Sequence, residues 1–133
     1  MKKSLLCLSI VFMLTGFTVV QARFKENISC RKAAKLIQKH IQDTNFVILD
    51  VRTPEEFKNG HIEKAIIIDF KSADFQDRIS LLNKNKKYLV YCRGGGRSSK
   101  SIGIMKNLKF NKLYNLYEGY ETWKKDGYKT VTD

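Results

Sequence analysis

Short apolar runs alternate along the chain with longer segments in which apolar residues recur at helical spacing. The runs predict strands at residues 24–28, 46–50, 65–68, 88–91 and 112–116. Several of them are almost wholly apolar, as expected for strands that are covered on both faces. Alternating strands and helices are typical of α/β proteins. The pattern therefore predicts a central, mostly parallel five-stranded sheet with helices on both faces.

Capping residues and the spacing of apolar positions mark the helices. Ser29 is placed to cap a helix over residues 30–42. The segment Thr53-Pro-Glu-Glu56 has a capping-box pattern with proline at the first helical position, and Gly60 ends that short helix. Further helices are expected at residues 74–82, 98–108 and 120–125, and the apolar positions expected to face the core are Ala33, Leu36, Ile37, Ile41, Phe75, Ile79, Leu82, Ile102, Ile104 or Met105, and Leu108.

The first 22 residues differ in composition from the rest of the chain. Met1-Lys-Lys3 is basic, residues 4–22 carry no charge, and Val20-Gln-Ala22 offers the small residues that a signal peptidase reads. We therefore expect a signal peptide at 1–22, cleaved before Arg23, and one domain at 23–133 without repeats or linkers.

Two other interpretations of this N-terminal segment stay open: a retained membrane anchor and a buried helix. The lysines at its start favour a cytoplasmic N-terminus, so the domain is exported in both of the first two cases. The expected location is the periplasm, either free or as a membrane-anchored domain that faces the periplasm. Contact with a membrane is expected only if the segment is retained.

The chain is strongly basic, with a formal net charge of +12 over 133 residues. Removal of residues 1–22 takes away two lysines and no acids, which leaves 12 − 2 = +10 over 133 − 22 = 111 residues. Such an excess of basic residues is one of the features of proteins that bind nucleic acids. The lysines are spread along the chain without a recognition-helix or aromatic-stacking motif, so we expect no nucleic-acid partner. A solvated basic surface is preferred over contact with an anionic membrane or another polyanion, and its field would attract anionic substrates.

One loop carries the candidate chemistry. The apolar run at 88–91 leads into Cys92, then Arg93, three consecutive glycines, Arg97 and Ser98. Glycines allow successive backbone N–H groups to turn toward an anion, and the following helix points its positive end at the same place. These effects and the two arginines lower the pKa of a cysteine thiol. The alternative, an inert buried thiol, explains neither the glycines nor the arginines.

The segment Cys-Arg-Gly-Gly-Gly-Arg-Ser at 92–98 resembles the active-site loop of rhodanese-type sulfurtransferases, Cys-x-x-Gly-x-Arg-Ser. Other family landmarks follow in order: Leu49-Asp-Val-Arg52 with Pro54-Glu-Glu-Phe57, Gly60-His-Ile62 with Ala65, and the closing segment 116–128. The resemblance covers about residues 28–128. Departures from the family pattern are Lys64 and Glu118 in place of glycine and Thr122 in place of alanine. Related phosphatases place five residues between cysteine and arginine, whereas four lie between Cys92 and Arg97.

The resemblance implies a rhodanese-like fold and a two-step sulfur transfer. The Cys92 thiolate would take the sulfane sulfur of an anionic donor such as thiosulfate, and the persulfide would pass it to a thiol or cyanide acceptor. Arg93 would meet the sulfonate of thiosulfate, or else point into solvent. At Gly94, thiosulfate-using members often carry a second cation. The catalytic residue is thus Cys92, and the expected substrate-binding residues are Arg93, Gly94, Gly95, Gly96, Arg97 and Ser98.

Structural roles are expected around this loop. Arg97 should pair with Asp50 or with a glutamate of the 54–57 segment, and Ser98 should cap the following helix and donate to the persulfide. Asp50 and Arg52 are expected to form an ion pair that supports the site. No group of residues has metal-ligand spacing, so neither a metal nor another cofactor is expected. Structural or core roles are expected for His61, Tyr114, Tyr117, Tyr120 and Trp123, and a packed, free thiol for Cys30 rather than a redox switch with Cys92.

Three hypotheses remain for the whole protein, which is expected to be a monomer. The first is an exported sulfurtransferase that uses a small anionic sulfur donor, thiosulfate or a persulfide, and a thiol acceptor. The second is a persulfide carrier or redox thiol protein that serves a dedicated partner. The third is a non-catalytic rhodanese-like binding module, which the intact Cys92 argues against.

Overall fold

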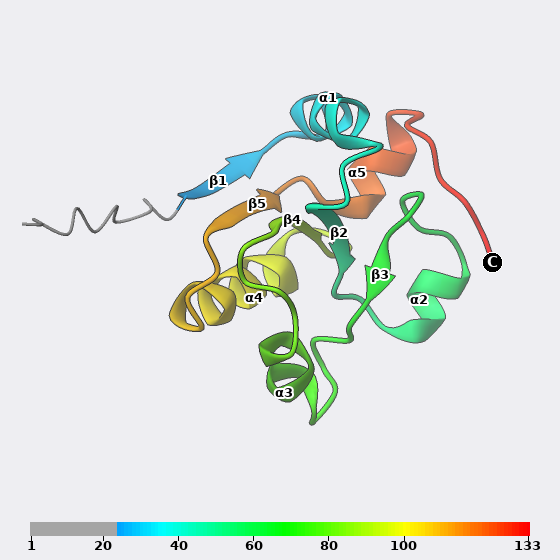
Figure 1. The fold of residues 1–133 in the computed structure, drawn as a ribbon. Coiled ribbons are helices and arrows are strands. Elements are labelled where there is room, and N and C mark those ends of the chain that lie inside the picture. The colour runs from blue at the N-terminus through cyan, green and yellow to red at the C-terminus, as the bar shows by residue number, and fades with distance from the viewer. Residues whose placement is uncertain (1–23) are drawn as a thin grey trace, which may run out of the picture.

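The computed structural model describes residues 24–133. The signal peptide or anchor expected at 1–22 lies outside this part of the chain. Five strands form one sheet in which every pairing is parallel. The α/β prediction, with a five-stranded parallel sheet, is confirmed (Figure 1). The strands, in spatial order, are β1 (Phe24–Ile28), β5 (Lys112–Leu116), β4 (Lys87–Tyr91), β2 (Phe46–Asp50) and β3 (Ile66–Ile67).

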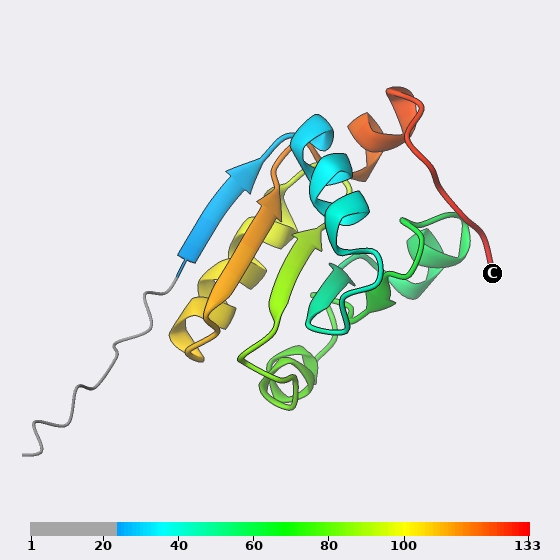
Figure 2. The ribbon, with the colours of Figure 1, turned by 45° about the horizontal axis from the view of Figure 1, so that its top comes forward.

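Helices cover both faces of this sheet, because its central strands are apolar on both sides. Figure 2 shows α1 in front of the strands and α4 behind them. One core cluster joins α3 and α4 to the sheet through residues such as Phe75, Ile79, Ile102 and Met105. A second cluster joins α1 and α5 to the other face. The helices are α1 (Cys30–His40), α2 (Pro54–Lys58), α3 (Phe75–Ser80), α4 (Gly96–Asn107) and α5 (Gly119–Lys125).

The helix caps that the sequence predicts are present at α1 and α2. The side chain of Ser29 accepts a hydrogen bond from the backbone N–H of Lys32 at 3.2 Å. Thr53 and Glu56 form the complete capping box, with Pro54 in the first turn of α2. These local bonds fix where the chain turns from strand into helix.

Two apolar positions are more exposed than predicted. The strand expected at 65–68 is reduced to Ile66–Ile67, and Ile66 is 42% exposed because β3 is the last strand of the sheet and has a neighbour on one side only. Ile41 is 44% exposed because α1 ends at His40, where the backbone N–H of Asp43 bonds the His40 carbonyl in a turn. An apolar run alone does not distinguish an edge strand from a central one.

Candidate functional site

Cys92 directly follows β4, at the carboxyl edge of the sheet, where parallel α/β folds place their ligands. The residue is 1% exposed and belongs to the core cluster on the α3 and α4 face. The three residues after it make a tight loop, and α4 then begins at Gly96. The fold thus holds the thiol between a strand end and a helix start.

Hydrogen-bond donors surround the Cys92 sulfur. The backbone N–H groups of Gly95 and Ser98 donate to Cys92 Sγ at 3.1 and 3.3 Å. The hydroxyl of Ser98 lies 3.5 Å from the same sulfur. Burial by itself would raise the pKa of the Cys92 thiol, but the bonds from Ser98, Gly95 and Gly94 outweigh it and lower the pKa. The loop is therefore built to hold a sulfur anion.

Of the three loop glycines, only Gly95 has a conformation that demands glycine. Its φ is 100°, and a Cβ at this position would lie 2.3 Å from the carbonyl oxygen of Tyr117. A Cβ on Gly94 or Gly96 would meet no atom within 4 Å. The left-handed conformation of Gly95 turns its N–H toward the sulfur while the chain passes close to the segment after β5.

The helix start was predicted two residues too late. Gly95, and not Ser98, is the N-cap of α4. Ser98 lies in the first turn of the helix, where its hydroxyl donates to the Gly95 carbonyl at 3.1 Å. The prediction that Ser98 caps the helix is wrong, because a glycine N-cap uses no side chain and leaves little signal in the sequence.

The loop is also held from its outer side by α5. The backbone N–H of Tyr120 donates to the Cys92 carbonyl at 2.8 Å, and that of Glu121 donates to the Arg93 carbonyl at 3.1 Å. Gly119 has a φ of 76°, and a Cβ there would lie 2.2 Å from the same Arg93 oxygen. These bonds turn the carbonyls of the loop outward, which leaves its N–H groups free to face the sulfur.

Arg97 forms a two-point ion pair with Glu56 of α2. Its Nη1 and Nη2 atoms lie 2.7 and 3.0 Å from the two carboxylate oxygens. The Arg97 guanidinium, helped by the backbone N–H of Thr53, lowers the pKa of Glu56 to about 2. The sequence predicts either Asp50 or a glutamate of the 54–57 segment as the partner of Arg97, and the structure shows the glutamate. The pair ties α2 to the first turn of α4 and keeps a positive charge close to Cys92.

Arg93 points away from the core, with its side chain 66% exposed. Its Nε atom lies 2.5 Å from a carboxylate oxygen of Glu121, which is itself exposed on α5. The contact with a sulfonate that the resemblance implies stays a prediction. An anionic substrate would compete with Glu121 for this guanidinium.

Asp50 and Arg52 form the ion pair that the sequence predicts. Arg52 Nη2 lies 2.7 Å from Asp50 Oδ2, both side chains are buried, and the same nitrogen donates to the Gly60 carbonyl at 2.7 Å. The guanidinium also lies 4.0 Å above the centre of the Tyr120 ring. The pair connects the end of β2 with the start of α5, and so steadies the segment that supports the loop.

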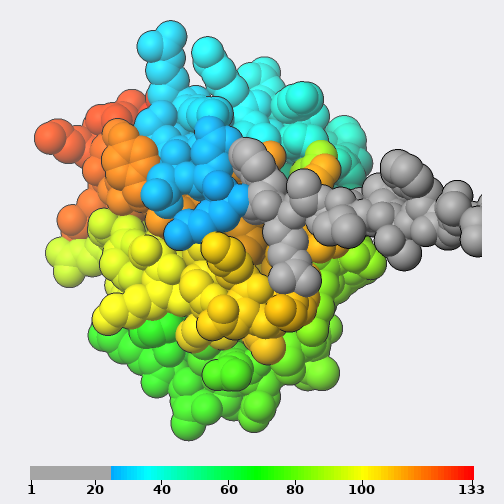
Figure 3. Space-filling view, turned by 90° about the vertical axis from the view of Figure 1, so that its left-hand side faces the viewer, coloured from blue at the N-terminus to red at the C-terminus, as the bar shows by residue number. Residues whose placement is uncertain are grey.

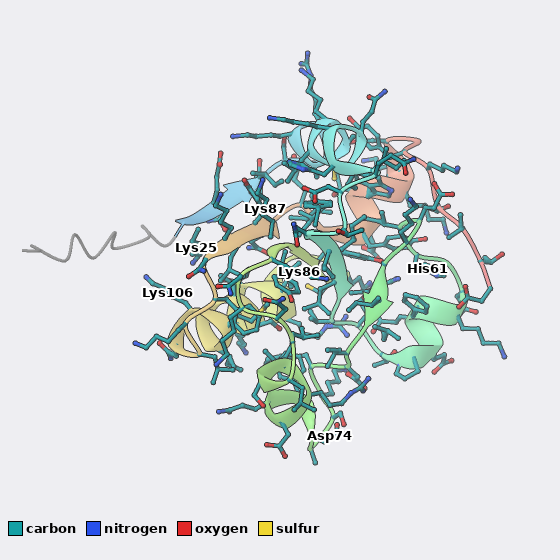
Figure 4. All side chains as sticks on the ribbon, in the orientation of Figure 1. Lys25, His61, Asp74, Lys86, Lys87 and Lys106 are labelled. Carbon is teal, nitrogen blue, oxygen red and sulfur yellow. The ribbon has the colours of Figure 1, made fainter. Side chains whose placement is uncertain are left out.

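Other residues that the sequence singles out lie in structural positions. His61 is buried, stacks on Phe57 and bonds its carbonyl at 3.0 Å; Figure 4 shows it beside α2. Trp123 and Tyr120 are buried, whereas Tyr114 is partly buried and Tyr117 is exposed.

Cys30 is a free, buried thiol at the start of α1. Burial, followed by the neighbouring Glu118, raises its pKa to about 12. Its backbone N–H donates to a Glu118 carboxylate oxygen at 2.6 Å. Cys30 packs in the core cluster on the α1 and α5 face, and Cys92 in the other cluster. A packed, unpaired Cys30 is what the sequence predicts.

Several supporting contacts escaped the sequence-based predictions. They are the carbonyl of Tyr117 against Gly95, the φ of Gly119, and the carboxylates of Glu118 and Glu121. All four belong to the segment after β5, which the sequence marks only as the closing motif. Their partners lie 22 to 88 positions away along the chain, which only the fold brings together.

An apolar groove of about 690 Å³ lies elsewhere on the domain, between the C-terminal end of α1 and the Trp123–Tyr128 ring pair. No residue of the 92–98 loop lines it. Within residues 24–133, no cluster of three histidine, cysteine or acidic side chains is arranged for a metal ion. Over the same residues, no helix has the length and apolar character needed to cross a membrane.

Comparison with known proteins agrees with this geometry. Residues 33–126 match the Rhodanese-like domain. Thiosulfate sulfurtransferase 16, chloroplastic, from Arabidopsis thaliana is 34% identical over 92 residues, which cover 62% of this chain and 77% of that protein. The tRNA uridine(34) hydroxylase of Legionella pneumophila is 35% identical over 83 residues, which cover 59% of this chain. They cover 33% of the hydroxylase, so the match spans about a third of that relative's length.

A solved structure shares the fold as well. The rhodanese-related protein from Thermoplasma volcanium superposes with a TM-score of 0.65 at 27% identity, over 81% of this chain and 99% of that one. The family match covers well over half of the sequence and includes the whole 92–98 loop. The chain therefore belongs to the rhodanese-like family.

Proposed function

We propose that this chain is an exported sulfurtransferase that moves a sulfane sulfur through a persulfide on Cys92. One observation carries the proposal: the Cys92 sulfur is buried, yet it receives N–H donors from Gly95 and Ser98. Such a site stabilises a thiolate before the reaction and a persulfide anion after it. A cysteine with a lowered pKa needs no neighbouring general base.

The first half-reaction breaks the S–S bond of a donor such as thiosulfate. The Cys92 thiolate attacks the outer sulfur, a new S–S bond forms, and sulfite leaves with the electron pair of the old bond. The total charge of −3 is the same on both sides, and no proton or oxidant is needed. Before the step the loop N–H groups stabilise the charge on Cys92 Sγ, and after it the charge lies on the outer sulfur of the persulfide, next to the same loop.

The second half-reaction restores the thiolate. A thiolate or cyanide attacks the outer sulfur of the persulfide, takes it with formation of a new bond, and Cys92 leaves as the thiolate. Cyanide would give thiocyanate, and a thiol would give a new persulfide. The same cradle serves the leaving group in this step, because the sulfur of Cys92 regains its negative charge.

Purified residues 23–133, reduced and mixed with thiosulfate and cyanide, test the proposal by formation of thiocyanate. Wild type should turn over, and Cys92→Ser should not; Cys30→Ser, which removes the other thiol of the domain, should keep the activity. Turnover that survives in Cys92→Ser would contradict the mechanism.

A persulfide carrier is the second candidate, favoured by the lack of a cation at Gly94 and by the pairing of Arg93 with Glu121. Both features weaken capture of a free dianion such as thiosulfate. A carrier would show a stable mass increase of one sulfur on Cys92 after exposure to a persulfide donor, with little turnover to cyanide. The sulfurtransferase would lose the added sulfur as soon as cyanide is supplied.

Export rests on the sequence of residues 1–22. Expression of the full chain in a Gram-negative host, followed by fractionation and mass measurement, tests it. A periplasmic chain that starts at Arg23 supports a cleaved signal peptide. A membrane-bound chain of full mass supports the anchor, and a cytoplasmic chain of full mass contradicts export.

A further inference from the structure

The edge of the sheet opposite Cys92 carries a concentration of lysines. Parallel strands all start at this amino edge, and the helix α4 ends there. Lysines stand at the start of β1, β4 and β5, in the loop before β4, and at the end of α4. We call the following group the lysine edge: Lys25, Lys84, Lys86, Lys87, Lys106, Lys109 and Lys112.

Backbone pairing brings these lysines together from distant parts of the sequence. Lys112 is the register partner of Lys87 on one side and of Phe24, next to Lys25, on the other. The backbone N–H of Asn111 donates to the Lys84 carbonyl at 3.2 Å. The backbone N–H of Lys109 donates to the Lys106 carbonyl at 3.1 Å. The labelled Lys25, Lys86, Lys87 and Lys106 lie around the strand starts in Figure 4, away from His61.

Acidic side chains do not neutralise the lysine edge. Within residues 24–133, none of its seven members forms an ion pair, whereas Lys32 and Lys129 elsewhere do. Lys87 interacts electrostatically with Asp43, but the Asp43 carboxylate is already engaged by the Asn45 backbone N–H and by His40. A group of unpaired lysines on one side of the domain is an electrostatic surface for a large anionic partner.

The position of β1 suggests the kind of partner. Phe24 pairs with Lys112, so the chain enters the domain at the lysine edge. The residues before it include the uncharged stretch 4–22. In Figure 3, β1 lies directly beside the segment around residue 110 on one face of the domain. An apolar segment joined to a basic surface is the pair of signals that holds proteins at anionic lipid bilayers.

We infer that the lysine edge binds the surface of an anionic phospholipid membrane. Cys92 lies at the opposite, carboxyl edge of the sheet, so the bound domain presents its loop to the aqueous side. The contact of the lysine edge is electrostatic, and residues 1–22, where they are retained, add an apolar contact with the same bilayer. The inference is independent of the sulfur chemistry proposed for Cys92.

Binding of residues 24–133 to lipid vesicles tests this inference. A rhodanese-like chain of similar extent has a solved structure, and it is matched over 99% of its length, so a domain of this size folds by itself. Co-flotation with phosphatidylcholine vesicles should be weak. Addition of phosphatidylglycerol should produce binding that falls as salt is raised.

Two variants of equal charge locate the contact. Lys25→Gln, Lys86→Gln, Lys87→Gln and Lys106→Gln together should weaken binding to the anionic vesicles roughly tenfold or more. The matched control carries Lys35→Gln, Lys58→Gln, Lys124→Gln and Lys125→Gln, all exposed and outside the lysine edge. The affinity of the control variant for the anionic vesicles should fall by less than about threefold. Both variants should keep the alkylation rate of Cys92 and thus the fold and the site.

Deuterium exchange of the wild-type domain on vesicles gives a readout without mutation. Protection should appear at residues 84–87 and 106–112, and not at the 92–98 loop. Three results would overturn the inference. They are no binding to anionic vesicles, an equal loss of vesicle affinity in the lysine-edge variant and its control, or protection of the 92–98 loop from exchange in place of residues 84–87 and 106–112. Binding to a single-stranded oligonucleotide without binding to vesicles would also overturn it and would indicate a nucleic-acid partner.

Discussion

One hydroxyl group links the two protonation states of Cys92. In the thiol form, the Cys92 S–H can donate to Ser98 Oγ at 3.5 Å while the Ser98 hydroxyl donates to the Gly95 carbonyl. In the thiolate form, the sulfur has no proton to donate, and the hydroxyl can turn toward it. The backbone donors of Gly95 and Ser98 stay in place in both forms. The side chain of Ser98 therefore responds to the charge, whereas the backbone is fixed.

Replacement of Ser98 by alanine should raise the pKa of Cys92. Burial opposes ionisation of this thiol, and the Ser98 side chain is the first of the hydrogen bonds that offset the burial. The rate of alkylation by iodoacetamide, followed against pH, should show its inflection at higher pH in Ser98→Ala. Ser99→Ala, at the exposed next position, should match wild type. An unchanged profile in Ser98→Ala would show that the backbone donors suffice.

Gly95→Ala should damage both stability and the thiol site, whereas Gly94→Ala should do neither. The alanine at 95 would be strained at a φ of 100° and would place Cβ 2.3 Å from the Tyr117 carbonyl oxygen. We expect a loss of at least about 2 kcal/mol in the free energy of unfolding. Urea denaturation measures this loss, and for Gly94→Ala it should stay within about 0.5 kcal/mol. Similar losses in the two variants would contradict the assigned roles.

Among the secondary-structure elements, α2, α4 and α5 together hold the loop. The Glu56–Arg97 pair connects α2 with α4, and the N–H groups of Tyr120 and Glu121 connect α5 with the loop carbonyls. None of these helices contains Cys92. Each fixes one part of the backbone around it, so changes in these helices should act on Cys92 through position.

The Glu56–Arg97 pair should make stability depend on pH. The folded pKa of Glu56 is about 2, against an ordinary value of 4.5, so the carboxylate contributes its full stabilisation above about pH 4.5. That contribution is lost as the pH falls from 4.5 to about 2. Glu56→Gln should lower the free energy of unfolding by about 1–2 kcal/mol at neutral pH, with an allowance for solvent screening.

Urea denaturation at pH 7 and pH 3 measures the effect of Glu56→Gln. The difference in the free energy of unfolding between Glu56→Gln and wild type should be smaller at the lower pH. Glu55→Gln, which changes an exposed neighbour in the same helix turn, serves as control and should follow wild type at both values. A gap that stays constant with pH would show that the pair contributes no proton-linked stability.

The sequence predicts these elements to within a few residues where local signals are strong. The Thr53 capping box and the apolar runs of β2 and β4 mark their elements clearly. The start of α4 was missed because Gly95 caps it without a side chain. The exposed edge position of β3 was missed because strand order depends on long-range pairing.

In the candidate site, too, the features with a local sequence signal were predicted and those that depend on long-range packing were missed. The sequence predicts the 92–98 loop because these residues match a known family motif. It also predicts that Arg97 pairs with Asp50 or with a glutamate of the 54–57 segment. The contacts of Tyr117, Gly119 and Glu121 with the loop depend on how α5 packs against β4. Backbone N–H and C=O groups make most of these contacts. Every residue other than proline carries both groups, so the residue type does not reveal which of them will be used.

At the scale of the whole molecule, the sheet separates two cores with different thiols. Cys92 belongs to the core on the α3 and α4 face, and Cys30 to the core on the α1 and α5 face. Hydrogen bonds lower the pKa of Cys92 against the effect of burial, while burial raises the pKa of Cys30 to about 12. The two thiols should differ strongly in reactivity although both are buried.

Alkylation of folded residues 23–133 near neutral pH should therefore modify one thiol per molecule, and Cys92→Ser should modify none. Intact mass after a short treatment with iodoacetamide counts the adducts. In denaturant, wild type should gain two adducts, because both cysteines are then exposed. Rapid modification of Cys30 in the folded domain would contradict its assignment to a closed core.

The contact between α5 and the 92–98 loop determines when, during synthesis and folding of the chain, the pKa of Cys92 can be lowered. The amides that fix the carbonyls of Cys92 and Arg93 come from residues made 28 positions later. A chain grows from its N-terminus, so Cys92 is synthesised well before its cradle can close. Until then the thiol keeps the higher pKa of an unstructured cysteine and is mostly protonated. We therefore expect the pKa of Cys92 to fall only after residues 120 and 121 have been synthesised and have folded against the loop, so that a nascent chain carries mainly the less nucleophilic thiol.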